Sequence, residues 1–306
     1  MAQKINLNKY TAEVKRNIGI NASDEIIEKD LLLTLIMAEF EKSGIGNDLI
    51  FKGGTLLSRN YLKYHRFSED LDFVHRDSNK LRHLKRSARE KRIKQFIDYF
   101  VPELKKVADT LELEFSADRS DTKFCTILHG RTVYIFRLYY IENNFIKVEI
   151  NFVENVIYTP KEISIKAITD FFDSKELMFI LGLKIENFRV MSYTLEEIII
   201  EKYRAVLTRD KLKERDLFDL FLIKGSLNAD ISEIAEKIRS SSLIKRDVDK
   251  IIEDKLNRIE KDEFFTSDEK IEYLAIAEYD TNEFEKFKER IKPKLIQICK
   301  SFQGSA

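Results

Sequence analysis

The sequence predicts an α+β fold, with a mixed β-sheet in the first half of the chain and a helical C-terminal half. Short apolar runs with strand-like alternation recur up to about residue 152, with helical segments between them. From about residue 170 onward, apolar residues recur at helical spacing almost to the end. We therefore expect two domains: residues 1–165 with the sheet, and residues 166–306, which are mainly helical and complete the functional site.

Composition narrows the class of protein. The chain has 306 residues, no net charge, 43% hydrophobic residues and 35% charged residues. It has no apolar run near the roughly 20 residues of a membrane span, and its first residues lack the apolar centre of a signal peptide. Cys125 and Cys299 lie far apart, without metal-ligand spacing. We expect a cytoplasmic protein that does not contact membranes.

Helical periodicity begins near the N-terminus. Residues 24–43 are expected to form a long helix, with Asp24 as its N-cap and a glycine pair, Gly44 and Gly46, at its end. The pattern then predicts a strand, a helix and a second strand at residues 49–51, 55–64 and 71–74. Arg59, one turn into that short helix, is expected on the surface.

A basic helix and a group of strands follow. The helix is expected over residues 79–111, with Pro102 as a candidate break. Strands are expected at residues 113–116, 123–128, 132–140 and 145–152, with hairpin turns at 129–130 and 142–144. Residues 76–94 carry nine Lys or Arg against two acids, a distribution that can attract a polyanion or simply form a solvated helix face.

Two aspartates, Asp70 and Asp72, are separated by Leu71. On a strand both carboxylates point to the same face, where they repel each other unless a cation lies between them. Mg²⁺ takes oxygen ligands and is commonly held by one or two carboxylates together with substrate phosphates. The spacing therefore favours a metal site, although the same pattern also occurs in surface loops.

A glycine pair, Gly53 and Gly54, precedes a predicted helix. Glycines allow the backbone to approach a ligand closely, and the first N–H groups of a helix favour phosphate. Thr55 can cap that helix or offer its hydroxyl group to a phosphate oxygen. Together with the aspartates, this turn favours transfer chemistry on a nucleoside triphosphate.

A third acid, Glu149, alternates with apolar residues in the strand predicted at 145–152. It can lie beside the aspartates as a third ligand or general base, or it can face solvent. Arg66, just before the aspartates, can touch phosphate or pair with an acid.

Lys202 falls on the apolar face of a helix with Leu195 and Val206. A buried ammonium group needs a partner. That partner is either a triphosphate or a salt bridge to Asp216 or Asp219, which lie three residues apart on a later helix. We favour Lys202 at the phosphates and Asp216 as a residue that holds either Lys202 or the nucleotide, and the choice between Asp216 and Asp219 stays open.

These residues form four blocks in a fixed order: KGGT at 52–55, RFSEDLDF at 66–73, TLEE with EK at 194–202, and RDLFDL at 215–220. The order resembles the AbiEii/AbiGii family of nucleotidyltransferase-like toxins, within the DNA polymerase β-like nucleotidyltransferase superfamily. The resemblance covers roughly residues 24–225. Thr55 stands where the superfamily usually has serine.

The resemblance implies a polymerase β-like nucleotidyltransferase core and an Mg²⁺-dependent toxin of a bacterial toxin–antitoxin or abortive-infection system, with a cognate antitoxin. It implies transfer of nucleotides from a nucleoside triphosphate to RNA, with tRNA as the expected acceptor. A protein acceptor, or nucleotide or RNA binding without turnover, are the alternatives. The implied roles are metal binding by Asp70 and Asp72, nucleotide binding by Lys52, Gly53, Gly54, Thr55 and Lys202, and further catalytic roles for Glu149 and Asp216. The expected RNA contacts in the basic segment are Arg82, Lys85, Arg86 and Arg89.

Overall fold

The computed structural model describes residues 7–18, 22–141, 143–171, 188–241, 248–266, 271, 276 and 278–303. These residues form two compact units. Unit 1 contains Met1–Val153 and Pro160–Ser192, and unit 2 contains Glu154–Thr159 and Tyr193–Ala306. The chain therefore crosses between the units three times, and each unit is built from two separate stretches of sequence.

Unit 1 is built on a seven-stranded sheet with the strand order β3-β4-β5-β2-β1-β7-β6. The pairs β2·β5 and β1·β7 are parallel and the other neighbouring pairs are antiparallel, so the predicted mixed sheet is confirmed. The strand bounds are β1 Leu49–Lys52, β2 Asp70–His75, β3 Cys125–Leu128, β4 Val133–Ile141, β5 Asn144–Asn151, β6 Lys161–Ser164 and β7 Arg189–Ser192.

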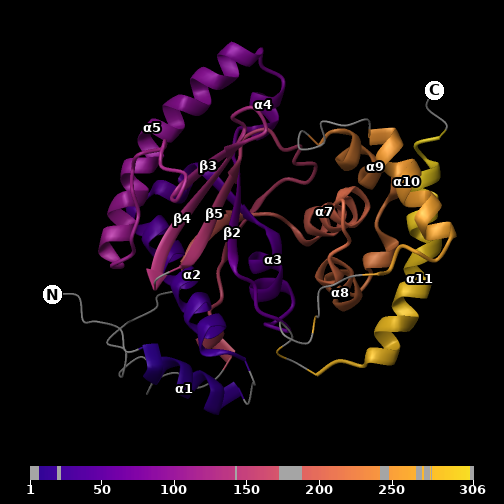
Figure 1. Ribbon diagram of the computed structural model, residues 1–306, viewed down its shortest axis with the longest axis horizontal. Helices are drawn as coiled ribbons and strands as arrows, with labels where there is room; N and C mark the ends of the chain where they lie inside the picture. The colour runs from indigo at the N-terminus through magenta and orange to yellow at the C-terminus, as the bar shows by residue number, and fades with distance from the viewer. Residues whose placement is uncertain are drawn as a thin grey trace. The chain divides into compact units, whose positions relative to one another are not determined.

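Two long helices, α2 (Asp24–Ser43) and α5 (Arg86–Thr110), pack on the face of the sheet that carries Phe73 (Figure 1). The Phe40 ring of α2 lies 5.9 Å from the Phe73 ring and 6.0 Å from the Phe100 ring of α5. This aromatic layer removes a large apolar area from water and anchors both helices. The face with Asp70 and Asp72 is the opposite one, because side chains alternate along β2.

The helix predicted at 24–43 is confirmed, and Gly44 ends it in the left-handed conformation at φ 73°. The expected cap is wrong by one residue. The Ser23 side chain accepts from the Ile26 N–H, so Ser23 is the N-cap and Asp24 begins the first turn.

The long basic helix is broken, but not where the sequence indicated. Helix α4 (Ser78–Arg82) ends before α5 begins at Arg86, whereas Pro102 lies inside an unbroken α5. The expected single helix from 79 to 111 is therefore two helices.

Two strands were missed by the periodicity argument. Strands β6 and β7 pair antiparallel at one edge of the sheet, and β7 lies at residues for which only helix was expected. Each strand has four residues, too few to display alternation. The strand expected at 113–116 is only an isolated bridge between Glu114 and Tyr139.

The helix after the glycine pair starts earlier and ends earlier than expected. It runs through α3 (Gly53–Leu56) and a π-helical turn, η2 (Leu57–Tyr61). Arg59 in that turn is only 1% exposed, so its expected surface position is wrong. Its guanidinium group lies 2.7 Å from the Asp30 carboxylate and also donates to the Asp30 carbonyl and the Thr34 hydroxyl. A partner 29 residues away turns this arginine inward.

The remaining helices in the described part of unit 1 are α1 Leu7–Ile18, η1 Ile45–Asp48 and η3 Ile168–Phe171. Unit 2 contains α7 Leu195–Thr208, α8 Glu214–Leu222, η4 Ser226–Asn228, α9 Ile231–Arg239, α10 Val248–Glu260 and α11 Thr281–Lys300. The expected helical C-terminal half is confirmed for these residues. None of the helices that the structure describes is long and apolar enough to span a membrane.

Candidate active site

Three carboxylates gather on one face of the sheet. Asp70 and Asp72 alternate with Leu71 on β2, and Leu71 is fully buried on the other face. Strand β5 runs parallel to β2, and its register places Glu149 directly beside Asp72. The structure thus brings Glu149 to the two aspartates. Its role as a ligand or base stays a prediction.

Lys147 lies among these acids. It pairs with Asp70 in the β2·β5 register, and its Nζ atom is 3.0 Å from Asp70 Oδ2. The same atom is 3.5 Å from Glu149 Oε2 and 4.0 Å from Asp72 Oδ1. Its ammonium group places one positive charge beside three carboxylates, which repel each other without a nearby cation. Alternation along β5 puts Lys147 on the same strand face as Glu149, but no sequence motif gives it a role.

The close approach of these charged groups shifts the pKa values of Glu149 and Lys147. Burial, followed by the charge of Asp72, raises the pKa of Glu149, while Lys147 and Lys52 oppose the shift. Burial lowers the pKa of Lys147, but Asp72, Asp70 and Glu149 together outweigh burial and raise it above the usual lysine range. Lys147 is therefore held firmly protonated.

The donor set suits a hard divalent cation, because it consists of carboxylate oxygens facing one point of positive charge. At that point the ammonium group of Lys147 stands in for a cation. Among the residues that the structure describes, no group of three or more His, Cys, Asp or Glu side chains is arranged to hold a metal ion, so metal binding by Asp70 and Asp72 stays a prediction.

The glycine turn lies against the aspartates. Gly53 is the first residue of α3 and has φ 83°, a value that L-residues rarely adopt. A Cβ atom at Gly53 would lie 2.4 Å from Asp72 Oδ2, so only glycine permits this approach. At Gly54 a Cβ atom would meet the ends of the Arg66 and Ser68 side chains at 2.9 Å.

The neighbours of the turn have structural partners. Lys52 is the N-cap residue of α3 and makes no side-chain capping bond. The Thr55 hydroxyl donates to the Asp70 carbonyl, which ties the turn to β2 rather than capping the helix. Arg66 is buried and donates to the Phe67 carbonyl.

Lys202 belongs to unit 2, on α7. It is 8% exposed, and its Nζ atom lies 2.8 Å from Asp216 Oδ1 and 2.5 Å from Asp219 Oδ2 on α8. Arg209 Nη1 is 2.9 Å from the other Asp216 oxygen. The structure therefore uses both aspartates, as the salt-bridge alternative requires. A role for Lys202 at the phosphates stays a prediction.

Burial alone would raise the pKa of Asp216. Lys202 and Arg209 outweigh burial and hold that pKa below the usual aspartate range.

A second buried charge cluster in unit 2 was missed. Lys237 of α9 is 1% exposed and lies 2.7 Å from Glu197 and 3.1 Å from Glu154. Glu197 also accepts from the backbone N–H groups of Ile157 and Tyr158. Glu197, the second glutamate of the TLEE block, is thus a structural residue that holds the Glu154–Thr159 stretch in unit 2. The sequence feature that could have revealed this cluster is Lys237, a lysine on the apolar face of a helix.

The four residues expected to contact RNA lie at the break between α4 and α5. Lys85 and Arg86 are exposed, whereas Arg82 and Arg89 are half-buried. Arg86 pairs with Glu90 across one helical turn at 2.8 Å. Contact with RNA stays a prediction.

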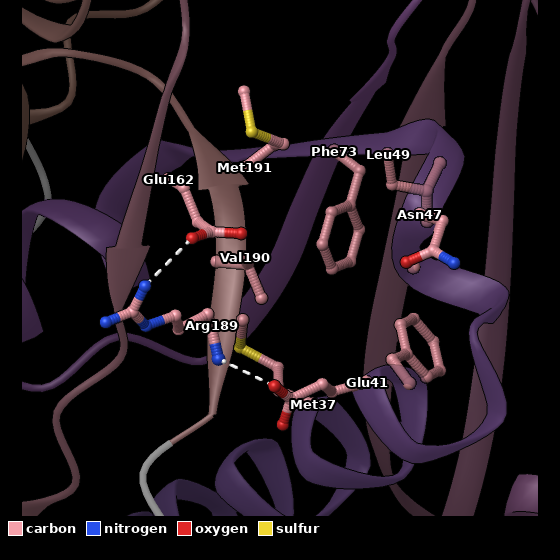
Figure 2. Close-up of a pocket in the computed structure, with 11 residues that line it drawn as sticks. Met37, Glu41, Asn47, Leu49, Phe73, Glu162, Arg189, Val190 and Met191 are labelled. Carbon is pink, nitrogen blue, oxygen red and sulfur yellow. Dashed lines mark hydrogen bonds and ion pairs between the residues drawn. The ribbon is translucent and has the colours of Figure 1, made fainter.

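A cavity of about 90 Å³ lies away from these residues, on the Phe73 face of the sheet. Figure 2 shows Met37, Phe73 and Met191 lining it, with Arg189 bonded to Glu41 and Glu162 at its rim. It contains none of the expected site residues, and its acidic residues Glu41 and Glu162 both accept hydrogen bonds from Arg189.

Comparison with known proteins gives one family. A family model described as the nucleotidyl transferase AbiEii toxin of type IV toxin–antitoxin systems matches residues 35–298. Among solved structures, the chain is similar to MenT4, a nucleotidyltransferase toxin from Mycobacterium tuberculosis. The two are 16% identical, the match covers 95% of this chain and 98% of that chain, and the TM-score is 0.46. No curated protein sequence matches the chain.

Proposed function

Because the chain belongs to the AbiEii family of nucleotidyl transferase toxins in type IV toxin–antitoxin systems, we propose that it is an Mg²⁺-dependent enzyme that transfers a nucleotide from a nucleoside triphosphate to RNA, with tRNA as the acceptor. The observation that carries the proposal is the meeting of Asp70, Asp72 and Glu149 on adjacent parallel strands beside the Gly53 turn. A cognate antitoxin is the partner that the family implies.

In this proposal Asp70 and Asp72 hold Mg²⁺, which supplies positive charge to the phosphates when bound. The turn at Gly53, Gly54 and Thr55, with Lys52, holds the triphosphate. An acceptor hydroxyl oxygen attacks the α-phosphorus, the new O–P bond forms, and pyrophosphate leaves as its bond to the α-phosphorus breaks.

The remaining roles concern the proton and the leaving group. Glu149 takes the proton of the acceptor hydroxyl, a task that its raised pKa favours. Lys202, kept in place by Asp216, neutralises the charge that develops on pyrophosphate.

The test is incubation of the chain with each labelled nucleoside triphosphate, total tRNA and Mg²⁺. Wild type is expected to label RNA, and Asp70→Ala is expected to lose at least about a hundredfold in rate, because a metal-binding carboxylate is removed. The matched control is Asp77→Ala, a carboxylate just beyond β2 that pairs with Lys80. It is expected to keep its activity.

Other outcomes decide between the alternatives. Label in protein alone would point to a protein acceptor. Tight nucleotide binding without transfer of any of the four nucleotides would leave a binding module and refute both transfer reactions.

A further inference from the structure

The strand register of the backbone places Lys147 beside the three acids. The parallel register sets it opposite Asp70, and its spacing of two from Glu149 puts it on the same face as all three acids. Strands β2 and β5 lie side by side in Figure 1. Its side chain is 26% exposed, so it does not simply extend into solvent.

Two further cations lie on that face: Lys52, the register partner of Asp72, and Arg137. Arg137 of β4 is the direct antiparallel partner of Lys147. Its guanidinium group donates to the Thr126 hydroxyl at 2.9 Å and lies over the Phe145 ring. Of Arg137 and Lys147, Lys147 is the one whose charged group lies within 4.0 Å of the three carboxylates.

The ammonium group of Lys147 and a divalent cation would compete for the same carboxylates. The ammonium group lies 3.0 to 4.0 Å from one oxygen of each carboxylate. A divalent cation held by Asp70 and Asp72 would lie close to that ammonium group, since both bind the same carboxylates. Two like charges at such a distance repel strongly in a half-buried site.

We propose that Lys147 is a built-in competitor of the divalent cation: its ammonium group offsets part of the negative charge of Asp70, Asp72 and Glu149 in the metal-free chain and weakens metal binding there. The inference rests on the proposed function in taking Asp70 and Asp72 as metal ligands. Lys147 is a positioning residue, because it holds the acids together without metal and sets how readily they accept one.

Direct Mn²⁺ binding tests this, measured by electron paramagnetic resonance on the full chain without nucleotide. Lys147→Met is expected to bind Mn²⁺ at least about tenfold more tightly than wild type, because a nearby positive charge is lost. Lys147→Arg keeps the charge and is expected to stay near wild type. Arg137→Met is the matched control, since it removes a cation from the same face that is bonded elsewhere.

The melting temperature, Tm, gives a second readout that does not depend on Mn²⁺ affinity alone. Without metal, Lys147→Met loses the ammonium group that lies 3.0 to 4.0 Å from the three carboxylates, so its Tm is expected to fall below that of wild type. Mn²⁺ is then expected to raise the Tm of Lys147→Met more than that of wild type.

Failures of the two proposals are distinguishable. Equal Mn²⁺ affinity in wild type and Lys147→Met, with binding lost in Asp70→Ala, would overturn the role of Lys147 and leave the metal site intact. Mn²⁺ binding that is insensitive to Asp70→Ala would overturn the metal site itself, and this inference with it.

Discussion

Asp216 holds its negative charge although its side chain is only 2% exposed, because Lys202 and Arg209 each contact one of its oxygens. The pair Lys202–Asp216 joins α7 to α8 inside unit 2. A buried pair of this kind is costly to break, since the remaining partner keeps an uncompensated charge. Whatever Lys202 does in the reaction, it also fastens these two helices.

This arrangement predicts a pH dependence of stability. The folded-state pKa of Asp216 is lowered, so its ionised form stabilises the fold above the unfolded pKa of 3.8. That stability is lost as pH falls through the lower folded pKa. Asp216→Asn is expected to destabilise unit 2 by about 3 kcal/mol near neutral pH. Below pH about 4, its stability is expected to change less with pH than that of wild type.

Hydrogen exchange of α8 amides across a pH series measures this effect within unit 2. Asp254→Asn, on the exposed side of α10, is the control and is expected to keep the wild-type dependence. The same dependence in Asp216→Asn and wild type would contradict the argument.

Single residues were predictable where local pattern decides their position. Alternation on β2 was enough to place Asp70 and Asp72 together. Arg59 and Lys147 were not predictable in the same way. The partner of Arg59 is 29 residues away, and two partners of Lys147, Asp70 and Asp72, lie on β2, which pairs with β5 through the topology of the sheet. Contacts of that kind depend on strand order, which periodicity does not contain.

At the level of elements, the short helix α3 can pack closely against β2 because Gly53 has no side chain. Gly53 combines a left-handed backbone with contact to Asp72 that leaves no room for a Cβ atom. The Thr55 bond to the Asp70 carbonyl holds the same two elements from the other side. The turn and the acidic strand are therefore one structural piece.

Gly53→Ala is expected to lose at least about a hundredfold in transfer rate, because the added methyl group displaces the Asp72 carboxylate by the order of an ångström. It also costs about 1–3 kcal/mol in backbone strain. Gly130→Ala is the matched control, since Gly130 also has a positive φ, 64°, but an added Cβ atom there would meet nothing within 4 Å. Initial rates of RNA labelling and thermal melts of both variants measure the effects. Similar losses in the two variants would argue against the special role of Gly53.

The extent of the 20-residue helix α2 was predicted well, and Gly44 marks its end, although its N-cap was placed one residue too late. The predictions that failed have physical reasons. Strands β6 and β7 are too short to show a period, and Pro102 is accommodated within α5 on an exposed side of the helix. Sequence patterns report local preference, whereas these features depend on what packs beside them.

For the whole molecule, the balanced net charge conceals a basic segment at residues 76–94. Lys85 and Arg86 are exposed at the start of α5, within the same unit as Asp70 and Asp72. Exposed cations in such a segment can contact RNA phosphates without reading bases.

The double variant Lys85→Ala/Arg86→Ala is expected to bind tRNA more weakly, because two phosphate contacts are lost. The slope of log affinity against log salt concentration is expected to fall by roughly one for each contact. Filter binding at several salt concentrations measures both quantities. Lys286→Ala/Arg290→Ala on α11 removes two other exposed cations and is expected to leave the slope unchanged. An unchanged slope in the first variant would exclude these residues from the RNA contact.

The buried contact of Lys237 with Glu154 also bears on how the protein is made. Glu154 leaves the ribosome 83 residues before Lys237, and Glu197 leaves it 40 residues before. Until α9 has been synthesised, both glutamates lack the lysine that makes their burial favourable. Unit 2 can therefore assemble its interior only late in translation, so a ribosome that stops before residue 237 releases a toxin fragment whose second unit is incomplete.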